Sequence, residues 1–320
     1  MDFDQNGTFD TAERITAAGG TPVEVGTNYL TFSVPCTVPA AATFARFRVG
    51  SSGGLAPTGL AHDGEVEDYT ASILPRGAQL VLDPLDPTGT KNVLIIVGSS
   101  GRDIISLKRM GSGAKARIDV VIDSQGFPLF HSAFTTTGLN RILAHSGCGN
   151  DVITGHANIS TPLWLYGDAG LDDIDGGSGA DILVGGDDRD EITGRKGRDL
   201  IIGGRGGDSL VSHNDEDILV AGTTRWDSND AALSAIMAEW TRADLTYVPR
   251  TDHIRAGGGL NGAFLLNANT VADDGARDNL TGWVGLDLFF ANIDGDGDPL
   301  KKDHNLDAKP GEVVIDINAP

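Results

Sequence analysis

The chain has 320 residues and a formal net charge of −21 at pH 7, from 24 Lys plus Arg and 45 Asp plus Glu. This length suits about two or three domains, and an apolar content of 40 % is enough to fill ordinary cores, which argues against wholesale disorder. So acidic a surface repels phosphate backbones and anionic lipid headgroups, which makes nucleic acid and membrane surfaces poor partners and favours cations.

Residues 1–74 predict an all-β module. Apolar residues recur there at every second position, as in strands with one buried face. The predicted strands contain Val23 and Val25, Leu30 to Val34, Ala45 to Val49, and Tyr69 to Ile73.

The first thirteen residues form an acidic loop that matches the twelve-position pattern D-x-[DN]-x-[DN]-G-x5-E. Side-chain oxygens at alternate positions, a backbone oxygen and a final Glu could wrap one calcium ion, with a plain acidic turn as the alternative. The candidate ligands are Asp2, Asp4, Asn6, Thr8 and Glu13, with Gly7 at the bend.

Further along the module, the string GEVEDY stands at 64–69. With its surroundings it resembles the GEVED domain, a β-sandwich module of large bacterial surface and secreted proteins, over about residues 2–74. The resemblance implies an extracellular setting and no catalytic role. Members usually have further strands before the acidic loop, and the sequence shows no export signal. We therefore expect an N-terminally truncated sandwich, and a chain that is a fragment of a longer exported protein.

Prolines and glycines mark residues 75–90 as a linker. A β-rich connector follows at 91–160, with strands predicted at Val93 to Val97, Ile118 to Ile122, Phe127 to Phe134 and Leu139 to Ala144. Two isolated copies of a glycine-aspartate motif lie at 98–106 and 146–154, where Asp103 and Asp151 belong either to a tight turn or to a calcium site. The two cysteines, Cys36 and Cys148, are expected to be isolated and buried.

The segment 167–220 repeats every nine residues, as GDAGLDDID, GGSGADILV, GGDDRDEIT, GRKGRDLII, GGRGGDSLV and SHNDEDILV. Its eighth position is always Ile or Leu, and its sixth is always Asp. The sixth-position residues are Asp172, Asp181, Asp190, Asp199, Asp208 and Asp217.

A nine-residue period of this kind is typical of a parallel β-helix in which each unit is half a coil. Turns on one edge are then eighteen residues apart, which pairs Asp172 with Asp190 and Asp181 with Asp199, and continues in the same way. Each pair flanks a slot lined by backbone carbonyls. Calcium takes about 6–8 oxygen ligands and fits this set, whereas zinc prefers nitrogen and sulfur. An acidic solenoid without metal is the alternative, but its stacked aspartates would repel one another.

These units resemble the hemolysin-type nonapeptide repeat, GGxGxDxUx, of repeats-in-toxin proteins. The resemblance implies a calcium-loaded parallel β-roll, placed here at 161–222, in a secreted bacterial protein. It also implies that the six aspartates and carbonyls at the glycine positions hold several Ca²⁺ ions. Those glycines are Gly170, Gly177, Gly179, Gly186, Gly197, Gly204 and Gly206. Departures at Asp188, Arg195, His213 and Asp215 predict three or four well-formed sites.

Residues 223–320 predict a capping region, resembling more loosely the segments that cap such repeats in planctomycete-type surface proteins. An amphipathic helix at about 229–242, with Asp227 or Ser228 as its N-cap, and a last strand at Val313 to Ile317 would cover the open end of the solenoid.

Catalytic motifs are weak. The string GSSGG at 50–54 lacks a strand-to-helix elbow, and the glycines at 257–262 lack a βαβ unit. The seven histidines show no HExxH or comparable ligand pair; His145, Cys148 and His156 could bind a transition metal, but surface and turn histidines are the favoured interpretation.

The fold class we predict is mainly β: a truncated β-sandwich, a connector, a β-roll and a small helix-containing cap. The predicted function is non-enzymatic: an extracellular or cell-surface structural or adhesion protein that folds on binding Ca²⁺. Surface polysaccharide or matrix proteins are candidate partners, and no transmembrane segment is expected. The alternatives are the non-catalytic remainder of a secreted hydrolase, and a carbohydrate-binding module in the N-terminal sandwich.

Overall fold

A computed structural model describes residues 42–49, 65–72, 75–295, 301–305 and 307–317, and it divides the chain into two units, Met1–Arg76 and Gly77–Pro320. In the first unit, β1 (Ala42–Val49) pairs antiparallel with β2 (Glu65–Ser72), which confirms two of the predicted strands. The other predicted strands lie outside the described residues. So does the acidic loop with its candidate ligands Asp2, Asp4, Asn6, Thr8 and Glu13.

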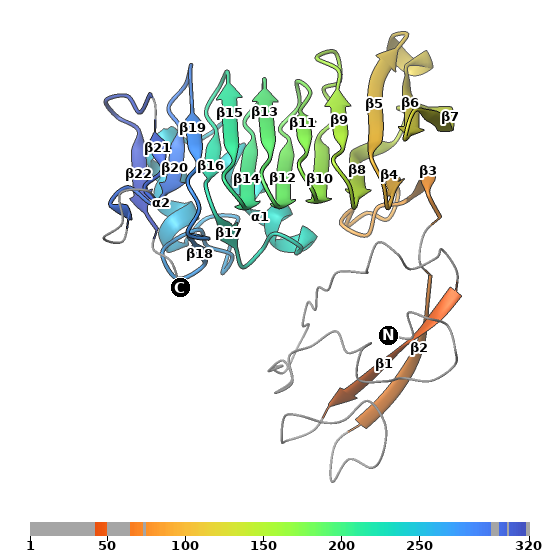
Figure 1. Ribbon diagram of the computed structural model, residues 1–320, viewed down its shortest axis with the longest axis horizontal. Coiled ribbons are helices and arrows are strands. Elements are labelled where there is room, and N and C mark those ends of the chain that lie inside the picture. Colours follow the sequence, from red (N-terminus) through yellow and green to blue (C-terminus); the bar gives the residue numbers. More distant parts are fainter. Residues whose placement is uncertain (1–41, 50–64, 73–74, 296–300, 306, 318–320) are drawn as a thin grey trace. The chain divides into compact units, whose positions relative to one another are not determined.

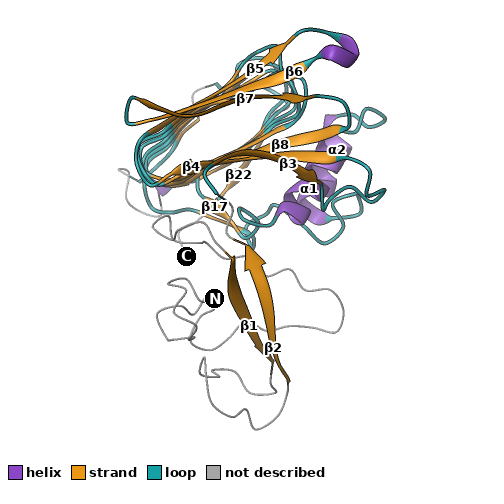
Figure 2. Cartoon of the chain, turned by 90° about the vertical axis from the view of Figure 1, so that its right-hand side faces the viewer, coloured by secondary structure: helices purple, strands orange, loops and turns teal. Residues whose placement is uncertain are grey.

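The second unit is a solenoid of two facing β-sheets, seen along its axis in Figure 2. Among the described residues, each sheet has nine strands. The first, which we call the covered sheet, has in spatial order β22 (Val313–Asp316), β20 (Leu288–Ala291), β16 (Ile218–Val220), β14 (Leu200–Arg205), β12 (Ile182–Asp187), β10 (Leu163–Ala169), β8 (Leu139–Gly147), β4 (Asn92–Ser99) and β3 (Gly77–Leu82). The second, the polar sheet, has β21 (His304–Asn305), β19 (Asn279–Thr281), β15 (Ser209–His213), β13 (Glu191–Arg195), β11 (Asp173–Asp175), β9 (Val152–Gly155), β5 (Asp103–Met110), β6 (Arg117–Ser124) and β7 (Phe127–Thr135).

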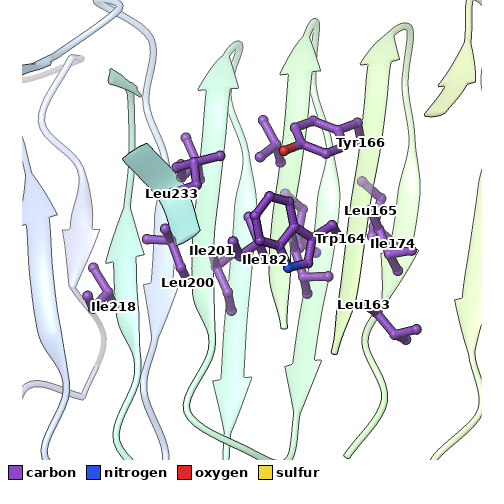
Figure 3. Packing of buried hydrophobic residues seen from close by; sticks show 14 of the residues in the cluster. Leu163, Trp164, Leu165, Tyr166, Ile174, Ile182, Leu200, Ile201, Ile218 and Leu233 are labelled. Carbon is purple, nitrogen blue, oxygen red and sulfur yellow. The ribbon is translucent and has the colours of Figure 1, made fainter. Parts of the chain in front are cut away.

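Within the repeats, consecutive units alternate between the two sheets, and parallel neighbours are eighteen residues apart. Leu183 pairs with Ile201 in the covered sheet, and Ile174 pairs with Ile192 in the polar sheet. The eighth-position side chains point between the sheets and are at most 1 % exposed. Figure 3 shows part of this core. The predicted mainly-β fold with a parallel β-roll is therefore confirmed, because each unit buries one invariant aliphatic side chain between the sheets.

The predicted connector is continuous with the repeats rather than separate from them. Its strands β4, β5, β8 and β9 belong to the same two sheets, where β8 pairs parallel with β10 and β9 with β11 (Figure 1). Antiparallel strands close this end, since β3 pairs with β4, and β7 with β6. Solenoid stacking thus begins well before the regular repeat, because the stack needs matching strand registers more than it needs the full nine-residue motif.

Two helices follow the repeats. The predicted helix is confirmed as α1 (Asp230–Trp240), but its N-cap is Asn229, whose side chain accepts from the Ala232 N–H. Asp227 and Ser228 were the wrong candidates; the Asp227 carboxylate instead accepts from the Thr224 N–H and hydroxyl. A second helix, α2 (Tyr247–Ala256), was not predicted, because it has no apolar stripe at helical spacing.

The helices form an insertion within the solenoid, whereas the sequence predicts a terminal cap. Strand β15 pairs parallel with β19, so Leu210 lies beside Leu280, which is 70 residues later instead of 18. The difference, 70 − 18, is an insertion of 52 residues. It carries α1, α2 and a short antiparallel pair, β17 (Thr223–Thr224) with β18 (Val271–Ala272). The solenoid then continues through β19, β20, β21 and β22.

One expectation about the cysteines is wrong. Cys148 is half-buried and disulfide-bonded, not an isolated buried thiol. No helix in the described ranges is long and apolar enough to cross a membrane.

Candidate calcium-binding ladders

Buried aspartates stack into two columns, one along each set of turns. We call them the first ladder and the second ladder. The first ladder precedes the strands of the polar sheet and contains Asp103, Asp151, Asp172, Asp190, Asp208, Asp278 and Asp303. The second ladder precedes the strands of the covered sheet and contains Asp181, Asp199, Asp217 and Asp287.

Neighbouring members of a ladder are joined by one hydrogen bond. The backbone N–H of each aspartate donates to Oδ1 of the aspartate on the next coil, at 2.8 Å from Asp172 to Asp190 and 2.7 Å from Asp199 to Asp217. This bond fixes the rotamer of each carboxylate and satisfies a buried donor. The predicted pairing of aspartates eighteen residues apart is therefore what the structure shows.

The second carboxylate oxygen, Oδ2, is left without a hydrogen-bond partner at most rungs. Asp190, Asp199, Asp208 and Asp217 are 0 % exposed, so water does not solvate this oxygen. Among the described residues, such buried Oδ2 atoms belong to Asp151, Asp172, Asp190, Asp199, Asp208, Asp217, Asp278 and Asp287. An ionised, dry and unpaired carboxylate oxygen is costly, and it calls for a cation.

Glycines at the first repeat position leave room beside these oxygens. A Cβ added to Gly185 would overlap both Asp190 Oδ2 and the carbonyl oxygen of Gly203 on the next coil. At Gly176 a Cβ would lie 3.0 Å from Asp181 Oδ2. The column Gly167, Gly176, Gly185, Gly194 and Gly203 shares this close approach to a carboxylate and a carbonyl. These five glycines were absent from the predicted ligand set. The glycine at the first position of five units was the sequence pattern that could have predicted them.

The predicted glycines lie at the second and fourth repeat positions. Of these, Gly170, Gly186, Gly197, Gly204 and Gly206 have positive φ, and Gly177 and Gly179 do not. The carbonyl oxygens of Gly179 and Gly186 point along the stack at the glycine of the next coil. Five other residues at these positions, namely Asp168, Asp188, Arg195, His213 and Asp215, also adopt positive φ, which is strained for residues with a Cβ.

Burial raises the pKa of the ladder carboxyls. It is the largest cause of the increase to about 7 for Asp172, about 8 for Asp190 and about 7 for Asp208, and the charges of neighbouring aspartates raise the pKa of Asp172 and Asp190 further. In the second ladder, burial likewise raises the pKa of Asp199 and Asp217 well above the usual range. At neutral pH the ladders must therefore take up either protons or cations.

The ladder aspartates differ in how many of their carboxylate oxygens already accept a hydrogen bond. Both carboxylate oxygens of Asp181 are occupied, since Oδ1 accepts from the Leu163 N–H and Oδ2 from the Gly177 N–H. Asp103 likewise accepts from the N–H and hydroxyl of Ser99. Asp303 accepts from the Asp278 N–H at Oδ1 and from the Asn292 N–H at Oδ2. These three rungs therefore offer less to an ion than the eight rungs whose Oδ2 has no partner.

The donor set fits calcium. It consists of carboxylate and carbonyl oxygens, which are hard ligands, in narrow slots between successive turns. Nowhere in the described ranges do three or more His, Cys, Asp or Glu side chains gather around one point, so an ion here would be held by one or two carboxylates and by backbone carbonyls. This arrangement disfavours zinc.

Sequence reasoning missed the members of the ladders beyond the regular array. The motif Gly-Leu-Asp-Leu-Phe at 285–289 keeps the spacing of the repeat, and Asp287 is its aspartate. Asp278 and Asp303 precede strands in the same way, with weaker flanking patterns. The isolated copies around Asp103 and Asp151 join the first ladder.

Comparisons with known proteins agree with these observations. Residues 1–72 match the GEVED domain. Residues 164–183, 175–210 and 184–219 match the RTX calcium-binding nonapeptide repeat (4 copies). No curated protein and no solved structure matches the chain significantly. The repeat array is thus similar to RTX calcium-binding repeats, and the N-terminal segment is similar to the GEVED domain.

Proposed function

We propose that this chain is an extracellular structural protein that calcium folds into a rigid solenoid after export, for adhesion or for assembly of a surface matrix. One observation carries the proposal: two continuous ladders of buried carboxylates run along the solenoid, with their Oδ2 atoms unpaired at eight rungs. Such a structure is poorly suited to low calcium, and well suited to the millimolar calcium outside cells.

The mechanism is ion-driven folding. Without calcium, the dry carboxylates repel one another and disfavour the compact stack. A divalent ion between successive turns neutralises them and lets the aliphatic side chains of the eighth position pack between the sheets. Because only the folded state presents the assembled ligands, the binding free energy appears as folding free energy. We propose this structural role in preference to an enzymatic one.

The test is a far-UV circular dichroism titration of the full chain with calcium, followed by EDTA. We expect β-structure to appear with calcium and to be lost with EDTA. The double variant Asp190→Asn/Asp199→Asn keeps the Oδ1 acceptors but removes one anionic oxygen from each ladder, so it should need at least about tenfold more calcium. The variant Glu191→Gln changes an exposed carboxylate next to Asp190 and should titrate like wild type. Spectra that ignore calcium would contradict the proposal.

The extracellular location has its own test. An antibody raised against the second unit should label intact source cells or the medium, and labelling confined to lysed cells would contradict this part of the proposal.

A further inference from the structure

The coil at 282–290 lies outside the matched repeats, yet it reproduces their ladder geometry. The Asp217 N–H donates to Asp287 Oδ1 at 2.9 Å, as the Asp199 N–H donates to Asp217 Oδ1 at 2.7 Å. Asp287 is 0 % exposed, and its Oδ2 has no hydrogen-bond partner among the described residues. The second ladder therefore continues past the helical insertion with the same unpaired oxygen.

The glycines of this coil also match those of the repeats. A Cβ added to Gly282 would overlap Asp287 Oδ2, just as one added to Gly185 would overlap Asp190 Oδ2. Gly285 has a φ of 147° and faces the carbonyl oxygen of Asp215 so closely that a Cβ could not fit. The space beside Asp287 is thus preserved by glycine, as in the matched array.

The coils on either side of 282–290 depart from the repeat pattern. Before it, Ser212 stands at the first position, and its hydroxyl donates to the Gly282 carbonyl at 2.8 Å. After it, the chain supplies its own cation: Lys309 Nζ donates to the Trp283 carbonyl of this coil and lies 3.6 Å from both Asp307 Oδ2 and Glu312 Oε1. The charge of Lys309 partly offsets the increase in the pKa of Asp287 that burial causes, but Asp287 Oδ2 itself has no hydrogen-bond partner among the described residues.

The two helices are attached to this part of the second ladder. The Tyr247 hydroxyl of α2 donates to the backbone carbonyl of Asp287 at 2.7 Å and accepts from the Val313 N–H at 3.0 Å. Trp240 Nε1 of α1 donates to the backbone carbonyl of Glu216 at 2.8 Å, and the Arg250 guanidinium of α2 donates to the Glu216 carboxylate. The helices therefore contact residues at or next to two consecutive rungs, Asp217 and Asp287.

We propose that the coil 282–290 is a further calcium site, and that an ion bound there controls the docking of α1 and α2 on the covered sheet. Asp287 Oδ2 would supply the carboxylate ligand. The coils at 212–220 and 282–290 lie on opposite sides of the 52-residue insertion in sequence, so an ion that fixes one against the other closes the chain around the helices. The inference rests on the proposed function, because it takes calcium as the ion.

The test measures calcium stoichiometry by isothermal titration calorimetry and amide hydrogen exchange of peptides covering 230–256, both on the full chain. Asp287→Asn should bind about one ion fewer, and its calcium midpoint for protecting α1 and α2 should rise about tenfold. The matched control, Asp172→Asn, removes the same group from the first ladder, which runs along the other set of turns. It should also lose about one ion but shift the protection midpoint of the helices less than about twofold.

A second variant tests the coupling without touching a ligand. Tyr247→Phe removes only the hydroxyl that contacts the Asp287 carbonyl, so the stoichiometry should stay at the wild-type value while the protection midpoint of the helices rises. If Asp287→Asn does not fold, Tyr247→Phe alone tests the coupling between the site and the helices. An unchanged midpoint in Tyr247→Phe, or equal midpoint shifts in Asp287→Asn and Asp172→Asn, would overturn the inference. A wild-type chain that binds no calcium would instead overturn the proposed function.

Discussion

The covered sheet and the polar sheet are built from the same nine-residue unit, yet their outer faces differ. In the covered sheet, the seventh and ninth positions are apolar and buried, as with Ile182 and Val184. In the polar sheet, the same positions hold residues such as Asp173 and Glu191, which are exposed. The repeat therefore contains a second period of eighteen residues, which marks the face that receives the helices.

The difference shows that one repeat unit has two structural roles, which are to build the ladder and the core and to set the outer face of its sheet. The sixth and eighth positions are the same in every unit, so both edges of the solenoid carry the same ladder chemistry. The flanking positions vary with the sheet, so only one outer face is adapted for packing. Tyr166 shows the result: it is 5 % exposed on β10, and its hydroxyl lies 3.5 Å from the Asp230 carboxylate at the start of α1.

The strongest test of this comparison places a positive charge at the seventh position of one repeat unit in each sheet. Leu200 is 0 % exposed in the covered sheet, so Leu200→Lys places an unpaired ammonium under the helices and should cost about 3–5 kcal/mol of unfolding free energy. Glu191→Lys puts the same side chain at the equivalent position of the polar sheet, where we expect a change within about 0.5 kcal/mol. Urea unfolding in saturating calcium measures both, and equal losses would remove the distinction between the faces.

A smaller effect tests whether the two edges share one chemistry. Gly185→Ala on the first ladder and Gly194→Ala on the second each push a Cβ toward the Oδ2 of an aspartate and a backbone carbonyl that cannot easily move. Each should cost about 1–3 kcal/mol and weaken calcium binding. Gly207→Ala is the control within the array, because a Cβ there meets one neighbouring atom, at 3.1 Å. Sensitivity on only one edge would show that the ladders are not equivalent.

The pH dependence of the calcium-free protein reports on the ladders of both edges. Burial raises the pKa of Asp172 to about 7 and that of Asp190 to about 8, above the usual value near 4 in the unfolded chain. Between these values the folded state binds more protons than the unfolded state, so stability should fall as pH rises from about 4 to about 8.

Far-UV circular dichroism in EDTA at pH 5 and pH 8 measures this trend as the amount of β-structure that the calcium-free chain keeps. In saturating calcium it should weaken or reverse, because ion binding displaces the protons and favours high pH. More β-structure at pH 8 than at pH 5 in EDTA would contradict the role of buried carboxyls.

Much of the site could be predicted from sequence because its determinants are local. Asp190 and its partners stand at fixed spacing, and the spacing alone gives the pairing across coils. The 52-residue insertion could not be predicted in this way, because the join between β15 and β19 depends on register matching over 70 residues. The amphipathic pattern of α1 suggested a terminal cap, and α2 could not be predicted because it has no apolar stripe. The first-position glycines are needed because they lie close to a carbonyl of the next coil. The sequence of a single repeat unit does not show such a contact.

The smallest expected effect concerns backbone strain at the edge of the first ladder. Asp188 has a φ of 76° at the fourth repeat position, where glycine is the rule, and its charge raises the pKa of both Asp172 and Asp190. Asp188→Gly should relieve the strain and the repulsion together, raising the unfolding free energy by about 0.5–1 kcal/mol, measured by urea unfolding in saturating calcium. Asp188→Asn removes the charge but keeps the Cβ, so the difference between the two variants isolates the strain. If Asp188→Asn stabilises as much as Asp188→Gly, the departure from glycine acts through charge alone.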